Sequence, residues 1–131
     1  MRLLDVNVCI DVLRGRTDVV DRLHDHGPAG LFLCAIVKAE LAYGARLSAD
    51  PRRALELTTA FCEPFVSLPF DDACVDVYAS IRSDLRAAGG IIGANDLIVA
   101  ATAVAHDLTL VTGNTTEFAR VPGLRVETWR T

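Results

Sequence analysis

Short apolar segments alternate with helical stretches along the whole chain, and this alternation limits the possible folds more than any other feature. Strands are predicted at residues 2–6, 31–35, 65–70, 108–112 and 124–129. Strands that alternate with helices pair in parallel, because each helix carries the chain back to the same end of the sheet. We therefore expect an α/β fold, a three-layer sandwich in which helices flank a central, mainly parallel sheet.

Helical periodicity fills most of the intervals between these strands. The predicted helices span residues 7–14, 17–26, 36–47, 51–63, 71–88 and 94–106. The helix that begins at Asp71 is amphipathic, with Val77, Ile81 and Leu85 on one stripe. The last helix is apolar on nearly every side, so we expect it to be buried. Residues 113–118 form a loop or a single helical turn.

Length and composition favour one globular domain over residues 1–131. Hydrophobic residues make up 51% of the chain and charged residues 23%, which excludes a disordered protein. No apolar run approaches the roughly 20 residues needed to cross a bilayer. The N-terminal segment also lacks the uninterrupted apolar stretch of a signal peptide. We therefore expect a cytoplasmic protein with no membrane contact.

Charge and cysteine usage narrow the functional classes further. A net charge of −4 excludes a protein that coats nucleic acid, so any contacts with RNA must be local. The four cysteines form no CxxC pair and lie among apolar residues, and we interpret them as buried, reduced thiols. The HxH motif of His24 and His26 is interpreted as a solvated helix end.

Asp5 stands at the carboxyl end of the first strand, directly after Leu3 and Leu4. Sites in open α/β sheets form outside the carboxyl ends of the strands. An alternative is that Asp5 caps the helix that begins near Asn7. Its position alone leaves both interpretations open.

Glu40 shares a helical stripe with Ile36, Tyr43, Gly44 and Leu47. We expect this stripe to be buried, because the other four residues are apolar or small. A buried carboxylate is costly unless a cation or hydrogen-bond donors compensate it. The alternative is a surface glutamate on a helix whose inner face lies elsewhere.

Asp96 lies in the first turn of the most apolar helix. The preceding residues IIGAN and the following residues LIVAA predict burial of the whole segment. The alternative is favourable placement of a carboxylate near the positive end of the helix dipole. Asn114 follows the fourth strand, where it could shape a turn or act as a ligand, and Glu117 is interpreted as solvated.

Acids that converge at one edge of a sheet provide oxygen ligands for a hard cation. Carboxylates and waters suit Mg²⁺ or Mn²⁺, whereas zinc prefers histidine and cysteine. Such ions serve phosphoryl chemistry by polarising the phosphate and activating water. The acids therefore predict a Mg²⁺ site, with Mn²⁺ as a substitute.

Three segments together resemble a known family. They are LLDVNVCIDVLRG at residues 3–15, AELAYG at residues 39–44, and IGANDLIVAATAVAHDLTLVTGNTTEFARVPGLRVETW at residues 92–129. In this order they resemble the PIN-domain ribonucleases, specifically the VapC toxins of bacterial toxin–antitoxin pairs. The resemblance covers the whole chain.

The resemblance implies an activity, a site and partners. The activity is magnesium-dependent hydrolysis of an RNA phosphodiester by a metal-activated water, carried out by a homodimer that a small VapB-like antitoxin inhibits. The family's three acids fall on Asp5, Glu40 and Asp96 as catalytic residues, with Asp5 and Asp96 as metal ligands. Asn114 falls on a position that orients water or a phosphate oxygen.

Two positions depart from the family pattern. Val6 stands where the family commonly has Thr or Ser, so a hydroxyl group that could orient Asp5 is missing. Asn114 stands where the family often has Asp, which puts a second metal ion in doubt. Arg14 and Arg82 are candidate contacts for RNA or for the antitoxin, although an arginine at a helix end can be simply solvated.

Two other functional classes remain as alternatives. A receiver-type signalling domain also gathers acids at strand ends, but it needs an Asp after a middle strand and a late Lys, and the only lysine here is Lys38. A non-catalytic PIN-like module would keep the fold and only bind RNA or a partner. Mg²⁺-dependent RNA cleavage that requires Asp96 distinguishes the enzyme from this module.

Overall fold

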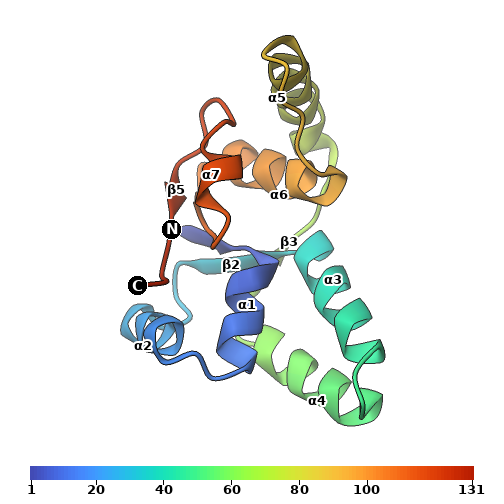
Figure 1. Ribbon diagram of the computed structural model, residues 1–131, viewed down its shortest axis with the longest axis vertical. Helices are drawn as coiled ribbons and strands as arrows, with labels where there is room; N and C mark the ends of the chain where they lie inside the picture. The colour runs from blue at the N-terminus through green and yellow to red at the C-terminus, as the bar shows by residue number, and fades with distance from the viewer.

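A five-stranded, entirely parallel sheet forms the centre of the protein, as the computed structural model of residues 1–131 describes it (Figure 1). The strands are β1 (Arg2–Leu4), β2 (Leu31–Cys34), β3 (Val66–Leu68), β4 (Thr109–Val111) and β5 (Val126–Glu127). Their order across the sheet is β3-β2-β1-β4-β5. This order places β1 at the centre, between β2 and β4.

Seven α-helices and one 3₁₀ turn connect the strands. They are α1 (Val6–Leu13), α2 (Thr17–His26), α3 (Ala35–Arg46), α4 (Pro51–Cys62), η1 (Asp72–Cys74), α5 (Val75–Ala87), α6 (Ala94–Ala105) and α7 (Thr115–Phe118). In Figure 1, α1, α2 and α4 lie below the sheet and α6 and α7 lie above it, while α5 projects beyond α6. The predicted three-layer α/β sandwich is therefore confirmed.

The central strands and α6 are buried because apolar side chains cover both faces of each. Leu3 and Leu4 of β1 are fully buried, as are Leu110 and Val111 of β4. Helix α6 buries six of its twelve residues, in agreement with the expectation from its composition. Thr102 is tolerated there because its hydroxyl group donates to the carbonyl of Ile98 at 2.8 Å.

The predicted strands are longer than the observed ones, and Asp5 explains the first difference. Its backbone N–H still donates to the Val111 carbonyl at 2.9 Å, as a strand residue would. Its side chain, however, accepts from Val6 N at 2.8 Å and begins α1. Capping by Asp5 therefore ends β1 at Leu4.

The expectation about the cysteines is confirmed, whereas the expectation of a solvated HxH motif holds for His24 and not for His26. All four cysteines are free and buried. His26 stacks on the buried Trp129, with ring centroids 5.2 Å apart, so its ring has a packing role. No helix is long and apolar enough to span a membrane.

Candidate functional site

The carboxyl edge of the sheet brings together segments that are far apart in the sequence. In a parallel sheet, the residues that follow each strand lie at the same edge. Asp5 follows β1, and residues 112–114 follow the neighbouring strand β4. This edge is therefore where the predicted acids can meet.

Asp5 is the most constrained of these acids. It is only 2% exposed, and its two oxygens accept hydrogen bonds from Val6 N at 2.8 Å, Thr112 Oγ1 at 2.8 Å and Asn7 Nδ2 at 3.4 Å. Burial raises the pKa of its carboxyl group, and the bonds from Thr112 and Val6 offset part of that rise. Asp5 thus caps a helix and also belongs to the acidic site, so the two interpretations do not exclude each other.

Thr112 supplies the hydroxyl group that Val6 lacks. Its side chain is fully buried, donates to Asp5 and accepts from Asn114 N at 3.0 Å. Gly113 N donates to Asn7 Oδ1 at 2.9 Å, which ties the same loop to α1. The sequence analysis missed Thr112, although its position after β4, beside the strand that ends at Asp5, could have identified it.

Glu117 is a further member of the site, and the expectation that it would be solvated was wrong. Its Oε2 accepts from Asn114 Nδ2 at 2.6 Å, and its Oε1 accepts from Gly93 N at 3.4 Å. Gly93 immediately precedes α6, so Glu117 connects the loop after β4 to the helix that carries Asp96. The single turn of α7 agrees with the sequence, which predicts a loop or a single helical turn over residues 113–118, but the partners of the Glu117 side chain depend on contacts with distant segments.

Asp96 shows the strongest electrostatic effect at this edge. Burial raises the pKa of its carboxyl group to about 6. The negative charges of Asp5, Glu117 and Glu40 add to this rise, in that order. Four carboxylates are therefore close enough to influence one another, as two like charges that share a site do.

The segment before Asp96 is less buried than expected. Ile91 is 74% exposed, and Gly93, Ala94 and Asn95 are also exposed, whereas residues 97 and 99–101 are buried. The expectation failed because residues 91–93 form a surface loop in which only Ile92 packs against the core. Asp96 lies where this exposed loop meets the buried helix.

Glu40 reaches the same group of acids, although the stripe assigned to it is not the inner face of α3. Tyr43 and Leu47 are 66% and 68% exposed, and α3 instead buries Val37, Leu41 and Ala45. The helix has apolar residues on two faces, and only its packing against α4 and β2 distinguishes them. Glu40 is half-buried at the boundary between them.

The environment of Glu40 shows that it lies close enough to Asp5 for their charges to interact. Burial raises the pKa of its carboxyl group, and the charge of Asp5 adds to the rise. The side chain of Asn95 offsets part of it through a hydrogen bond. Glu40 and Asp96 therefore approach Asp5 from two different helices.

The carboxylates have the chemistry of a hard-cation site, but they are not arranged as a complete set of metal ligands. No group of three or more His, Cys, Asp or Glu side chains is arranged to hold a metal ion. All four acids offer oxygen donors, which suit Mg²⁺ or Mn²⁺, and burial makes their negative charges costly without a counter-ion. The residues therefore fit a divalent ion that keeps several of its waters.

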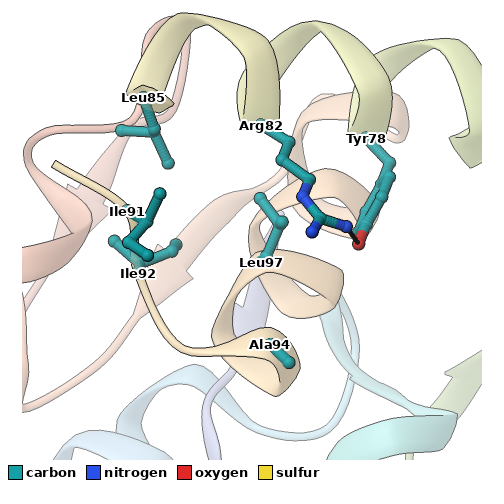
Figure 2. A pocket seen from close by; sticks show the side chains of 7 residues that line it. All are labelled: Tyr78, Arg82, Leu85, Ile91, Ile92, Ala94 and Leu97. Carbon is teal, nitrogen blue, oxygen red and sulfur yellow. Dashed lines mark hydrogen bonds between the residues drawn. The ribbon is translucent and has the colours of Figure 1, made fainter. Parts of the chain in front are cut away.

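The two candidate arginines lie in different hollows. Arg14 and Glu40 line one hollow together, between α1, α3 and α4. Arg82 lines another with Tyr78, whose hydroxyl group accepts from Arg82 Nη1 at 3.0 Å (Figure 2). Figure 2 shows that this second hollow extends to Ala94 and Leu97, on the turn that carries Asp96.

A parallel sheet with coupled carboxylates at its carboxyl edge defines an α/β domain with an acidic site. The chain belongs to the PIN-domain family, whose sequence pattern matches residues 2–124. It is 30% identical over 127 residues to the tRNA(fMet)-specific endonuclease VapC of Salmonella typhimurium, a match that covers 97% of this chain and 96% of the relative. It is also 34% identical over 126 residues to toxin FitB of Neisseria gonorrhoeae, covering 90% and 91% of the two chains.

A solved structure gives the same relationship at the level of the fold. The Rickettsia felis VapBC2 complex bound to a DNA fragment from its promoter contains a chain that superposes with a TM-score of 0.92. The two chains are 30% identical, and the match covers 98% of each. The resemblance to VapC ribonucleases inferred from the sequence is therefore confirmed.

Proposed function

We propose that this protein is a divalent-metal-dependent endoribonuclease and the toxin of a VapBC-type toxin–antitoxin pair. The observation that carries the proposal is the raised pKa of Asp5, Glu40 and Asp96, which results from burial and mutual repulsion at one edge of the sheet. A fold tolerates such a costly cluster when the charges serve a function. The names of the relatives, which include several VapC ribonucleases, support the choice of RNA as the substrate.

Asp5 and Asp96 would hold Mg²⁺, with Glu40 completing the acidic set. When bound, the ion supplies Lewis acidity that polarises the phosphate and lowers the pKa of water. Mg²⁺ commonly binds through one or two carboxylates and keeps several waters, so a group of three preformed ligands is not required. Mn²⁺ is expected to substitute for it.

The chain's own residues have distinct tasks at this edge. Thr112 and Asn7 fix the orientation of the Asp5 carboxylate through their hydrogen bonds. Glu117 anchors the Asn114 side chain at 2.6 Å, so Asn114 presents a fixed polar group to a water or a phosphate oxygen. Prepositioned polar groups avoid reorganisation during the reaction, which is the main source of electrostatic catalysis.

A small VapB-like antitoxin is the proposed partner. Structural relatives of this chain include VapBC and FitAB complexes, and these support a protein inhibitor. The hollow that contains Arg14 and Glu40 also contains Ile10, Leu13 and Leu57, of which Leu13 and Leu57 are exposed. An apolar antitoxin segment in this hollow would reach the acidic site at Glu40 and exclude RNA from it.

Cleavage of RNA by the purified protein tests the proposal. We expect cleavage with Mg²⁺ or Mn²⁺, none in excess EDTA, and products with 5′-phosphate and 3′-hydroxyl ends. Asp96→Asn and Glu40→Gln should abolish cleavage, whereas Asp25→Asn, which changes an exposed carboxylate on α2, should not. Binding of RNA without cleavage would identify a non-catalytic PIN-like module, and undiminished cleavage in EDTA would exclude the metal.

A further inference from the structure

The segment after β5 reaches the same edge of the sheet as the candidate site. Arg130 lies three residues beyond this strand, and its guanidinium group forms two hydrogen bonds with Asp11 of α1. Nε donates to Oδ2 at 2.7 Å and Nη2 donates to Oδ1 at 3.0 Å. A two-bond contact between arginine and carboxylate fixes the plane of the guanidinium group as well as its position.

The fixed guanidinium group lies directly against Gly113. A Cβ atom built on Gly113 would come within 2.9 Å of Arg130 Nη1 and 3.0 Å of Arg130 Cζ. Gly113 does not have a positive φ, so a larger residue here would have to displace the Arg130 guanidinium group rather than strain the backbone. Arg130 therefore packs on the backbone of the loop that follows β4.

That loop holds Asp5 in place from two sides. Gly113 N donates to Asn7 Oδ1 at 2.9 Å, and Asn7 Nδ2 in turn donates to Asp5 Oδ2 at 3.4 Å. The preceding residue, Thr112, donates directly to the same Asp5 oxygen at 2.8 Å. A shift of Gly113 away from α1 would lengthen these contacts together.

We propose that Arg130 is a positioning residue for the candidate site. Held by Asp11, it presses on Gly113 and keeps residues 112–114 where Thr112 and Asn7 orient the Asp5 carboxylate. The proposal rests on the proposed ribonuclease function, because it describes how the same site is held. Asp11 is only 8% exposed, so removing Arg130 would leave a buried carboxylate without its hydrogen-bonded partner.

The C-terminal segment has other anchors, so the fold does not depend on Arg130 alone. Trp129 is buried and its Nε1 donates to Glu127 Oε2 at 2.9 Å. Thr131 donates to Asp18 Oδ2 from both its backbone N, at 2.9 Å, and its hydroxyl group, at 3.1 Å. Arg130→Lys also keeps a positive charge beside Asp11, but an ammonium group cannot form the planar contact with Gly113.

Steady-state RNA cleavage and amide hydrogen exchange of the full chain test this role. For Arg130→Lys we expect kcat to fall about tenfold, KM to change little, and exchange of the Gly113 amide to become faster. Gly113→Ala should also lower kcat, because the methyl group of the alanine would meet the Arg130 guanidinium group. In the Arg130→Lys background, the same substitution should lower kcat much less. Arg125→Lys is the matched control, since Arg125 pairs with Asp107 at 2.9 Å at the opposite edge of the sheet, and it should change neither measurement.

Several results would overturn the proposal. The first is that Arg130→Lys changes neither kcat nor the hydrogen exchange of the Gly113 amide. The second is that Arg130→Lys and Gly113→Ala lower kcat independently of each other. The third is that Arg130→Lys raises KM alone, which would indicate direct contact between Arg130 and RNA. If the unmodified protein cleaves no RNA, the proposed function fails, and hydrogen exchange still decides whether Arg130 holds the loop.

Discussion

At the scale of single residues, the main feature of this protein is that its buried, mutually repelling carboxylates destabilise the fold when they are charged. Burial and neighbouring charges raise the pKa of Asp96 to about 6. A raised pKa means that the folded protein binds this proton more tightly than the unfolded chain, whose carboxyl groups titrate near pH 4. Stability from Asp96 is therefore complete below about pH 4 and is lost as the pH rises through about 6.

The first prediction follows from this loss of stability as the pH rises. In the metal-free protein, Asp96→Asn should raise the Tm at pH 7 to 8, because the amide has no charge to desolvate, and the gain should disappear near pH 4. Thermal unfolding in EDTA across this pH range measures the effect, with Asp25→Asn as the control for loss of an exposed charge. A lower Tm at neutral pH would contradict the assignment of Asp96 to a cluster of repelling acids.

The second prediction concerns Glu117, the acid that the sequence analysis placed in solvent. Glu117→Gln keeps the size of the side chain and removes one of the four negative charges, so we expect about tenfold weaker Mg²⁺ binding. The pKa of Asp96 should fall at the same time, because Glu117 contributes to its rise. Titration calorimetry with Mg²⁺ and an Asp96 side-chain titration by NMR measure both effects. Unchanged Mg²⁺ affinity, equal to that of the exposed-site control Glu63→Gln, would remove Glu117 from the site.

At the scale of elements, the loop between β4 and α7 matters as much as the helices that carry the acids. Its residue Thr112 is buried and connects β4 to the end of β1 through a single hydroxyl group. That hydroxyl group both donates to Asp5 and accepts from Asn114 N. This side chain thus adds to the backbone pairing of β1 and β4 a direct contact between two segments that are separated by more than a hundred residues.

The third prediction tests this connection. Thr112→Val keeps the shape but removes one of the three hydrogen bonds to Asp5 and leaves the Asn114 backbone N–H without its acceptor, so it should destabilise the fold by about 1–3 kcal/mol and raise the pKa of Asp5 further. Thr102→Val is the matched control, because Thr102 is equally buried but bonds only a carbonyl of its own helix. Urea unfolding of both variants provides the comparison. An equal loss of unfolding free energy in Thr112→Val and Thr102→Val would mean that the hydrogen bond to Asp5 adds nothing to stability.

At the scale of the whole molecule, the fold leaves apolar side chains uncovered near the site. Ile91, Tyr43 and Leu47 are each more than half exposed. Single exposed apolar side chains are common on soluble proteins, and only a contiguous apolar patch marks a surface that binds another chain. The expectation of an antitoxin therefore rests on the solved VapBC and FitAB complexes, and that of a second copy rests on the family resemblance.

The fourth prediction concerns these partners. Expressed alone, the protein should be a dimer and should stop growth, and coexpression with an antitoxin encoded beside it should restore growth. Light scattering gives the mass, and Asp96→Asn is the control that should remain dimeric but harmless. A harmless monomer would contradict the proposed assembly and the toxin function together.

The pattern of the chain alone was sufficient to predict the layered parallel fold and a buried α6, and it singled out Asp5, Glu40 and Asp96, which lie close enough to influence one another's pKa. Those predictions rest on local periodicity and on the cost of placing charge among apolar residues, and both are properties of neighbouring positions. Which face of α3 is buried, the inward turn of Glu117 and the hydroxyl group of Thr112 depended on contacts between distant segments. The same is true of Arg130 on Gly113, since only the packed structure decides which surfaces meet.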